Sequence, residues 1–140
     1  MNEAAMHKIQ SIYGIENWSN GYFDINASGN IVVRPSQNDP RSVDLKKVVD
    51  QLVKEKKLSL PLLVRFPQIL TNQLRTLANA YKESMQLFEY RATHYPVFPM
   101  KVNPRREVVE EFLKESSRLR LGLECGSKAE LFAAVSQDQD

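Results

Sequence analysis

The stretch HYPVFPMKVNPRREVVEEFL, residues 94–113, decides the fold class of this protein. Its first ten residues, 94–103, are apolar with proline interruptions and predict a strand. Pro104 stands where a helix begins, because proline suits the first helical positions. Apolar residues at helical spacing then predict the buried face of that helix: Val108, Val109, Phe112 and Leu113.

A second strand and helix follow this stretch. Leu119, Leu121 and Leu123 alternate as in a strand, and the spacing of Ser127 and Glu130 is that of a capping box. The capping box precedes the apolar residues of a further helix, Leu131, Phe132 and Val135. Strand–helix–strand–helix order predicts an α/β fold in which the last two strands are parallel neighbours covered by helices. The pattern stops at residues 137–140, with too few strands to close a barrel.

The amino-terminal third predicts a different organisation. Residues 1–18 are weakly helical at best, and residues 22–33, YFDINASGNIVV, predict a β-hairpin. Gly29 and Asn30 tolerate the positive φ that a tight hairpin turn requires. The polar, proline-bounded segment 35–40 predicts a loop, so we expect an amino-terminal segment over 1–40 and a second domain over 41–140.

Between these regions the pattern predicts helix, strand and helix. Apolar residues at helical spacing predict a helix over 44–57, and the lysines of 54–57 read either as its solvated face or as a phosphate-binding patch. The apolar run 58–67, which contains Val64, predicts an edge strand because Pro61 cannot donate to a ladder. An apolar stripe along 68–88 predicts a long helix that packs in the core.

Length and composition exclude several classes of protein. The chain has 140 residues, the length of one ordinary domain, with 42% hydrophobic and 26% charged residues. A formal net charge of +2 does not favour nucleic acid as a partner. No apolar run is long enough for a membrane span, and the amino terminus lacks the features of a signal peptide. The single cysteine forms no internal disulfide, so we expect a soluble cytoplasmic protein.

Lys101 is the main candidate for chemistry. It ends the predicted strand 94–103, and reactive groups gather at the carboxyl ends of strands in parallel α/β folds. Met100 and Val102 flank it, and burial disfavours the charged form of a lysine. A neutral amine is the form that makes a Schiff base. The alternative is a solvated lysine at the end of a strand.

Other polar residues carry weaker signals. His7 and His94 have no acidic partner at ligand spacing, so we expect structural or solvent-exposed roles for both. Cys125 ends an apolar strand, where a free cysteine is usually a small core residue. Arg105 and Arg106 either meet an anion or lie at the surface, as arginines at a helix start commonly do.

Four blocks of sequence carry a family resemblance that covers residues 9–135: YGIENWSNGYFDINASGNIVVRP, LPLLVRFPQIL, YPVFPMKVNPRREVVEEFL and LGLECGSKAEL. In order and spacing they resemble the amino-terminal part of the biosynthetic arginine decarboxylases. Met100, Pro104 and Cys125 depart from the family pattern, and none of these departures removes Lys101.

The resemblance implies a fold, a cofactor and a reaction. It implies an amino-terminal hairpin segment followed by the first units of a (β/α)8 barrel that binds pyridoxal 5′-phosphate and is incomplete in this chain. It also implies that Lys101 holds the cofactor as a Schiff base while L-arginine is converted to agmatine and CO2 for polyamine synthesis. Mg2+ as a further cofactor and a homo-oligomeric complete enzyme rest on the resemblance alone.

Two alternatives stay open at this point. The chain is either part of a working decarboxylase, acting on arginine or on another amino acid such as diaminopimelate or a carboxylated polyamine, or an inert or assembly module that needs a complementary chain. A (β/α)8 barrel takes about 250 residues. We therefore expect the isolated chain to be inactive and the remaining site residues to lie beyond residue 140.

Overall fold

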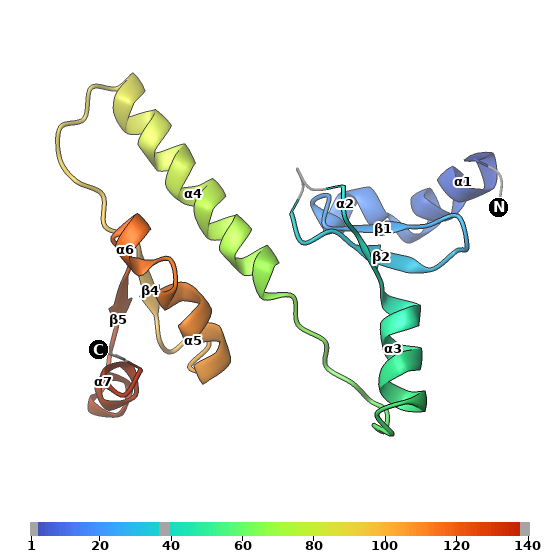
Figure 1. Ribbon diagram of the computed structural model, residues 1–140. Coiled ribbons are helices and arrows are strands. Elements are labelled where there is room, and N and C mark those ends of the chain that lie inside the picture. The colour runs from blue at the N-terminus through green and yellow to red at the C-terminus, as the bar shows by residue number, and fades with distance from the viewer. Residues whose placement is uncertain (1–2, 37–39, 138–140) are drawn as a thin grey trace. The chain divides into compact units, whose positions relative to one another are not determined.

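The structure is a computed structural model that describes residues 3–36 and 40–137. It contains both helices and strands and forms two compact units, one up to Ile69 and one from Leu70 onward (Figure 1). Each unit has its own small sheet. The loop predicted over 35–40 lies partly outside the described residues, and the division at residue 40 stays a prediction.

The first unit is built on the predicted hairpin. Strand β1 (Phe23–Ile25) pairs antiparallel with β2 (Ile31–Val33), which confirms the hairpin. A short strand that the sequence did not indicate, β3 (Val43–Asp44), pairs with the other edge of β2. In the turn, Gly29 has φ of 80° and its N–H donates to the carbonyl oxygen of Asn26. The conformation at Gly29 is one that side chains with a Cβ adopt rarely.

Two helices precede the hairpin, α1 (Glu3–Tyr13) and α2 (Ile15–Ser19). The prediction of weak helicity over 1–18 is therefore wrong. Tertiary contacts explain the difference: the side-chain amide of Gln10 on α1 donates to the carboxylate of Asp24 on β1 at 2.7 Å. Trp18 of α2 packs against Phe23 with ring centroids 5.4 Å apart. The core of this unit consists of Ile15, Tyr22, Ile25, Val32 and Val33.

Helix α3 (Leu45–Lys54) lies within the predicted range of 44–57. Asp44 caps its amino end by accepting a hydrogen bond from the Lys47 N–H, and the same carboxylate accepts from the side chains of Asn26 and Asn30. This one side chain thus joins the hairpin turn to the start of α3. Along α3, half-buried apolar residues alternate with exposed lysines, as the periodicity predicted.

The strand predicted over 58–67 is wrong. Residues 58–66 run from α3 toward α4 without pairing to any strand of the described chain. Burial alternates from Leu62 to Phe66, so the segment keeps the period of an extended chain. A strand also needs a hydrogen-bonded neighbour, and a pattern of apolar residues does not supply one.

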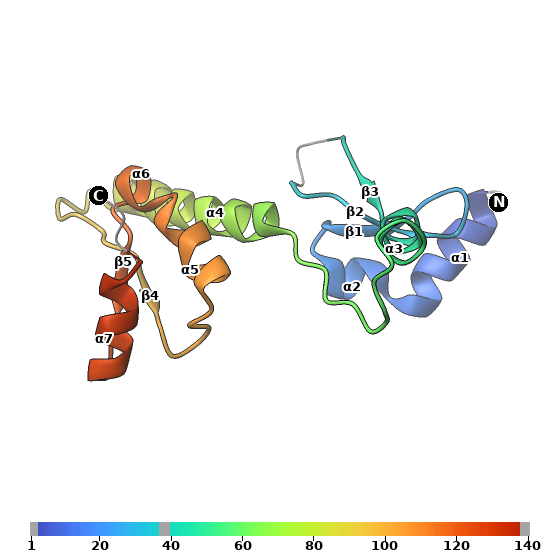
Figure 2. The same ribbon diagram turned by 60° about the horizontal axis from the view of Figure 1, so that its bottom comes forward.

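The second unit contains the parallel pair that the sequence predicted. Helix α4 (Pro67–Leu87) leads into β4 (Val97–Pro99), α5 (Arg106–Leu113), α6 (Ser116–Leu119), β5 (Gly122–Glu124) and α7 (Lys128–Val135). Strands β4 and β5 are parallel, with Phe98 opposite Leu123 and Pro99 opposite Glu124. Figure 2 shows this unit from a second direction.

The core of the second unit lies between α4, α5 and the parallel pair. Leu74, Phe112 and Leu121 form its centre. The ring of Phe98 on β4 stacks on Phe112 of α5 with centroids 3.9 Å apart, so the predicted apolar face of α5 does cover the sheet. Val109 and Met100 of the same unit are fully buried.

The predicted strands are longer than the observed ones. Strand β4 covers only 97–99 of the predicted 94–103, and Leu119 lies at the end of α6 instead of in a strand. Arg120 explains the second difference, because its φ of 55° ends α6 in the left-handed region. The N–H of Leu121 then donates back to the carbonyl oxygen of Ser116 before β5 begins.

The helix ends and faces of this unit agree with the sequence in part. Ser127 accepts a hydrogen bond from the Glu130 N–H, which confirms the predicted amino cap of α7. The apolar side chains of α7 are exposed, with Phe132 at 73%, so this face has no partner in the described chain. On α4, Leu74 is buried but Leu77 and Tyr81 are half-exposed, so only part of the predicted stripe is core.

No helix of the described residues is long and apolar enough to cross a membrane.

Candidate functional site

Lys101 lies directly beyond the carboxyl end of β4, in a tight turn. The N–H of Met100 donates to the carbonyl oxygen of Glu124 at 3.0 Å and extends the parallel pairing by one residue. The N–H of Val102 then donates to the carbonyl oxygen of Pro99 at 3.1 Å and turns the chain. The backbone that carries Lys101 is therefore fixed on both sides. The strand predicted to contain Lys101 ends just before it.

The partner of Lys101 comes from the neighbouring strand. Its Nζ lies 3.8 Å from a carboxylate oxygen of Glu124, the last residue of β5. The parallel register places these two residues at the same end of the sheet. Sequence reasoning did not identify Glu124, although its position at the end of the second predicted strand was a usable signal.

The surroundings of Lys101 are more polar than the sequence suggested. Met100 is fully buried, but Val102 is 67% exposed and the Lys101 side chain is 68% exposed. The expected apolar environment is thus present on one side only. The arrangement presents an accessible primary amine beside a carboxylate at the carboxyl edge of a parallel pair.

The other candidates near this edge have ordinary partners. Arg105 lies 3.6 Å from Glu107, and Arg106 bonds Glu110 one turn along α5 at 2.6 Å, so the surface alternative describes both arginines. Cys125 follows Glu124 and is half-buried. The N–H of Gly126 donates to the Glu130 carboxylate at 2.8 Å.

The two histidines lie away from Lys101. His7 is an exposed residue of α1 in the first unit. His94, in the segment before β4, stacks on Tyr81 of α4 with centroids 4.1 Å apart. Within the described ranges, no three His, Cys, Asp or Glu side chains gather in a way that could hold a metal ion. The Mg2+ that the resemblance implied stays a prediction.

Other lysines compete with Lys101 in principle. They lie on helices or in loops, and all are exposed: Lys46, Lys47, Lys54, Lys56, Lys57 and Lys128. Of these, Lys46 and Lys54 pair with Asp50 on the same helix. None of the competitors lies within two residues of the carboxyl end of the parallel pair, and this topological position distinguishes Lys101.

Comparison with curated proteins identifies close relatives. The chain is 40% identical over 131 residues to the biosynthetic arginine decarboxylase of Phocaeicola vulgatus, covering 94% of this chain and 20% of that protein. It is 43% identical over 124 residues to the protein of the same name from Rhodopirellula baltica, covering 89% of this chain and 18% of the relative. It is also 42% identical over 127 residues to that of Pseudomonas aeruginosa, covering 91% and 20%.

A solved structure agrees with these relatives. The crystal structure of the biosynthetic arginine decarboxylase SpeA from Campylobacter jejuni matches with a TM-score of 0.77 and 28% identity, covering 91% of this chain and 20% of that one. No protein-family model matches the chain. The resemblance noted in the sequence is therefore confirmed over nearly the whole chain, and the chain spans about a fifth of the length of the curated relatives.

Proposed function

We propose that this chain is the amino-terminal part of a decarboxylase that converts L-arginine to agmatine and CO2 with pyridoxal 5′-phosphate as cofactor. The observation that carries the proposal is the similarity to biosynthetic arginine decarboxylases over 94% of the chain, at 40% identity. The side chain of Lys101 is exposed, so its amine is accessible to a cofactor. The parallel pair β4–β5 and its helices would be the first units of a barrel.

The residues at the carboxyl edge of the sheet suit a cofactor that carries an aldehyde. Such a cofactor needs a primary amine that reaches it, and the amine of Lys101 is exposed and set at the end of a fixed strand. When bound, pyridoxal phosphate supplies an electron sink that stabilises the carbanion formed as CO2 leaves. Among the described residues, we assign the attachment of the cofactor to Lys101 alone.

Glu124 would orient the amine of Lys101. At 3.8 Å its carboxylate attracts the protonated amine and holds it at the carboxyl end of the pair. The fully buried side chain of Met100 anchors the turn that carries Lys101.

The test uses the complete polypeptide that contains these residues, purified with pyridoxal phosphate and supplied with carboxyl-labelled arginine. We expect release of labelled CO2 and formation of agmatine, with diaminopimelate and a carboxylated polyamine as poor substrates. Lys101→Ala and Lys101→Arg should each lower turnover at least about 100-fold, which corresponds to about 2.7 kcal/mol of barrier. An arginine side chain at position 101 cannot form the Schiff base, because its guanidinium stays protonated.

Lys128→Ala is the matched control, since Lys128 is an exposed lysine in the same unit. It should leave turnover unchanged. Full activity in Lys101→Ala, or a stronger preference for diaminopimelate than for arginine, contradicts the proposal.

The exposed face of α7 favours a second candidate function. Leu131, Phe132 and Val135 are 52%, 73% and 63% exposed, which suits a module that assembles with a complementary chain. Co-purification from cells that express the chain at its native level distinguishes the two. A separate polypeptide bound in constant ratio supports assembly, and its absence supports the single-chain enzyme.

A further inference from the structure

A large cavity lies at the other end of the parallel pair from Lys101. Its volume is about 1080 Å3, and its walls are the second half of α4, the segment 89–94 and the end of α6. The segment 89–94 leads toward the start of β4, and residues 118–120 lead into β5. The cavity is therefore at the amino end of the strands, whereas Lys101 follows their carboxyl end.

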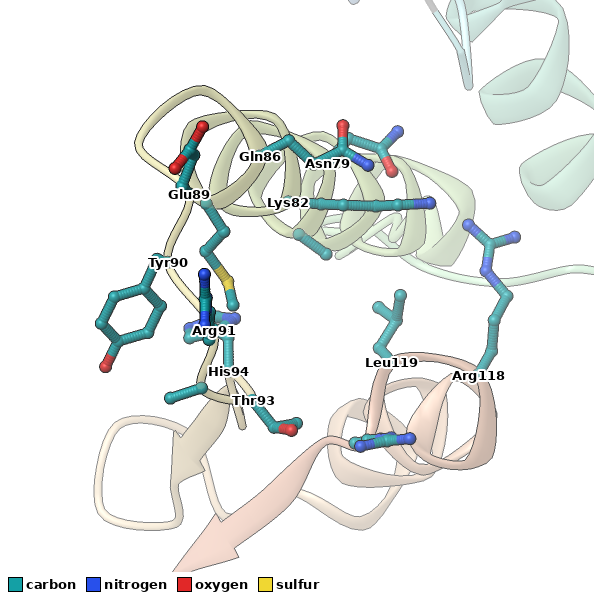
Figure 3. A pocket seen from close by; sticks show the side chains of 14 residues that line it. Asn79, Lys82, Gln86, Glu89, Tyr90, Arg91, Thr93, His94, Arg118 and Leu119 are labelled. Carbon is teal, nitrogen blue, oxygen red and sulfur yellow. The ribbon is translucent and has the colours of Figure 1, made fainter.

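Cationic side chains dominate this cavity. Lys82, Arg91, Arg118 and Arg120 line it, together with a single carboxylate, that of Glu89. Figure 3 shows Lys82 on one wall, Arg118 on another and Arg91 on the connecting segment. Arg118 lies 3.8 Å from the Glu115 carboxylate.

The Glu115 carboxylate does not balance this charge. It already accepts two hydrogen bonds from the guanidinium of Arg75, at 2.5 and 3.0 Å. Lys82, Arg91 and Arg120 have no ion-pair partner within residues 3–36 and 40–137. Four positive side chains that share one cavity with a single lining carboxylate repel one another, and an anion relieves that repulsion.

An aromatic cavity adjoins the cationic one. Its volume is about 430 Å3, and it shares four lining residues with the larger cavity: Met85, Tyr90, Thr93 and His94. The stacked rings of Tyr81 and His94 form part of its wall. Phe88 is 78% exposed and Tyr95 is 61% exposed, although both line the cavity. Large rings left in solvent around one hollow indicate a surface that binds a flat apolar group.

We propose that these adjoining cavities bind a nucleoside polyphosphate. The phosphates would lie among Lys82, Arg91 and Arg120, because guanidinium groups hydrogen-bond phosphate oxygens in pairs. The base would pack against the rings beside His94. The aromatic cavity, at about 430 Å3, lies within the roughly 300–1,000 Å3 of small-molecule sites, and the cationic cavity is slightly larger than that range.

A small ligand fits these observations better than a nucleic acid. The formal net charge of the chain is only +2, so no excess of positive charge is available for a long phosphate backbone. Four positively charged side chains in one hollow match the charge of a short polyphosphate.

The experiment measures binding to the full chain by titration calorimetry with ATP, inorganic triphosphate and adenosine as separate probes. We expect saturable binding of ATP, at least tenfold weaker binding of triphosphate and weaker binding still of adenosine. Arg91→Gln combined with Arg120→Asn should weaken ATP binding at least tenfold. Asparagine is chosen because it tolerates the left-handed backbone at residue 120. His94→Ala should weaken ATP binding but leave triphosphate binding unchanged.

The matched control is Lys54→Gln combined with Lys56→Gln, which removes two exposed positive charges from the first unit. It should leave ATP binding unchanged, and circular dichroism of each variant checks that the fold is kept. Absence of saturable ATP binding, equal weakening in the control or triphosphate binding as tight as that of ATP overturns the proposal. So does tight binding of poly(U) that ATP does not displace.

Discussion

At the scale of single residues, the buried carboxylate of Glu115 is the clearest case of a charge stabilised mainly by one partner, Arg75. The hydrogen bonds from Arg75 lower the pKa of Glu115 below its ordinary value of 4.5, and they outweigh burial, which raises it. In the unfolded chain the group titrates near the ordinary value. Its contribution to stability is therefore complete above about pH 4.5 and is lost as the pH falls through the lower folded-state pKa.

We predict that Glu115→Gln reduces this pH dependence. At neutral pH the variant should lose about 1–3 kcal/mol of unfolding free energy, because the hydrogen bonds from Arg75 lose their charged acceptor. Below the lowered folded-state pKa of Glu115 the wild type and the variant should converge. Urea unfolding and hydrogen exchange in α5 measure the loss of unfolding free energy at neutral pH and its disappearance at low pH. Glu83→Gln, on the exposed face of α4, is the control. A constant difference at every pH contradicts the assignment.

The sequence identified Lys101 but not its surroundings. Its place at the end of an apolar stretch was visible because strand ends follow from local pattern. The contact with Glu124 depends on the parallel register, which joins residues far apart in the chain. The exposure of the amine likewise depends on which elements cover it, and neighbouring residues such as Met100 and Val102 do not determine that.

At the scale of elements, the hairpin turn depends on Gly29. An added Cβ there meets no atom within 4 Å. The only energetic cost of a larger residue is therefore backbone strain at a φ of 80°. We predict that Gly29→Ala destabilises the hairpin by about 1–2 kcal/mol. Hydrogen exchange of the β1 and β2 amides measures this.

Gly122 provides the comparison for this prediction. It also has open space around its Cβ position, but its φ lies outside the positive range. Gly122→Ala should leave the exchange of β4 and β5 unchanged or slow it, because alanine restricts the unfolded chain. Faster exchange in β5 than in the wild type, or no effect of Gly29→Ala on β1 and β2, disagrees with this account.

Local signals predicted some elements well and others poorly. The hairpin, α3, α5 and the Ser127 cap of α7 were visible because turn residues, periodicity and capping act within a few residues. Helix α1 was missed because its stability comes from contacts such as Gln10 with Asp24. The predicted strand at 58–67 failed because an apolar extended segment pairs only where a neighbouring strand is present.

At the scale of the whole molecule, the described residues to which we assign a part in the proposed chemistry are Lys101 and Glu124. Lys101 supplies an amine, but the basic side chains that follow it, Arg105 and Arg106, are paired to Glu107 and Glu110. We predict that the purified 140-residue chain forms no agmatine from arginine above a control with pyridoxal phosphate alone. Chromatography of the reaction products measures this, and agmatine formation by the chain alone would show that its own residues complete the site.

The central claim is that Lys101 holds the cofactor, and reduction of the loaded protein tests it most directly. The complete polypeptide is saturated with pyridoxal phosphate, reduced with borohydride, digested and mapped by mass spectrometry. We predict a single pyridoxyl label on the peptide that contains Lys101, and loss of that label in Lys101→Arg. A label on Lys128, Lys46 or any other lysine, with Lys101 unmodified, would contradict the account.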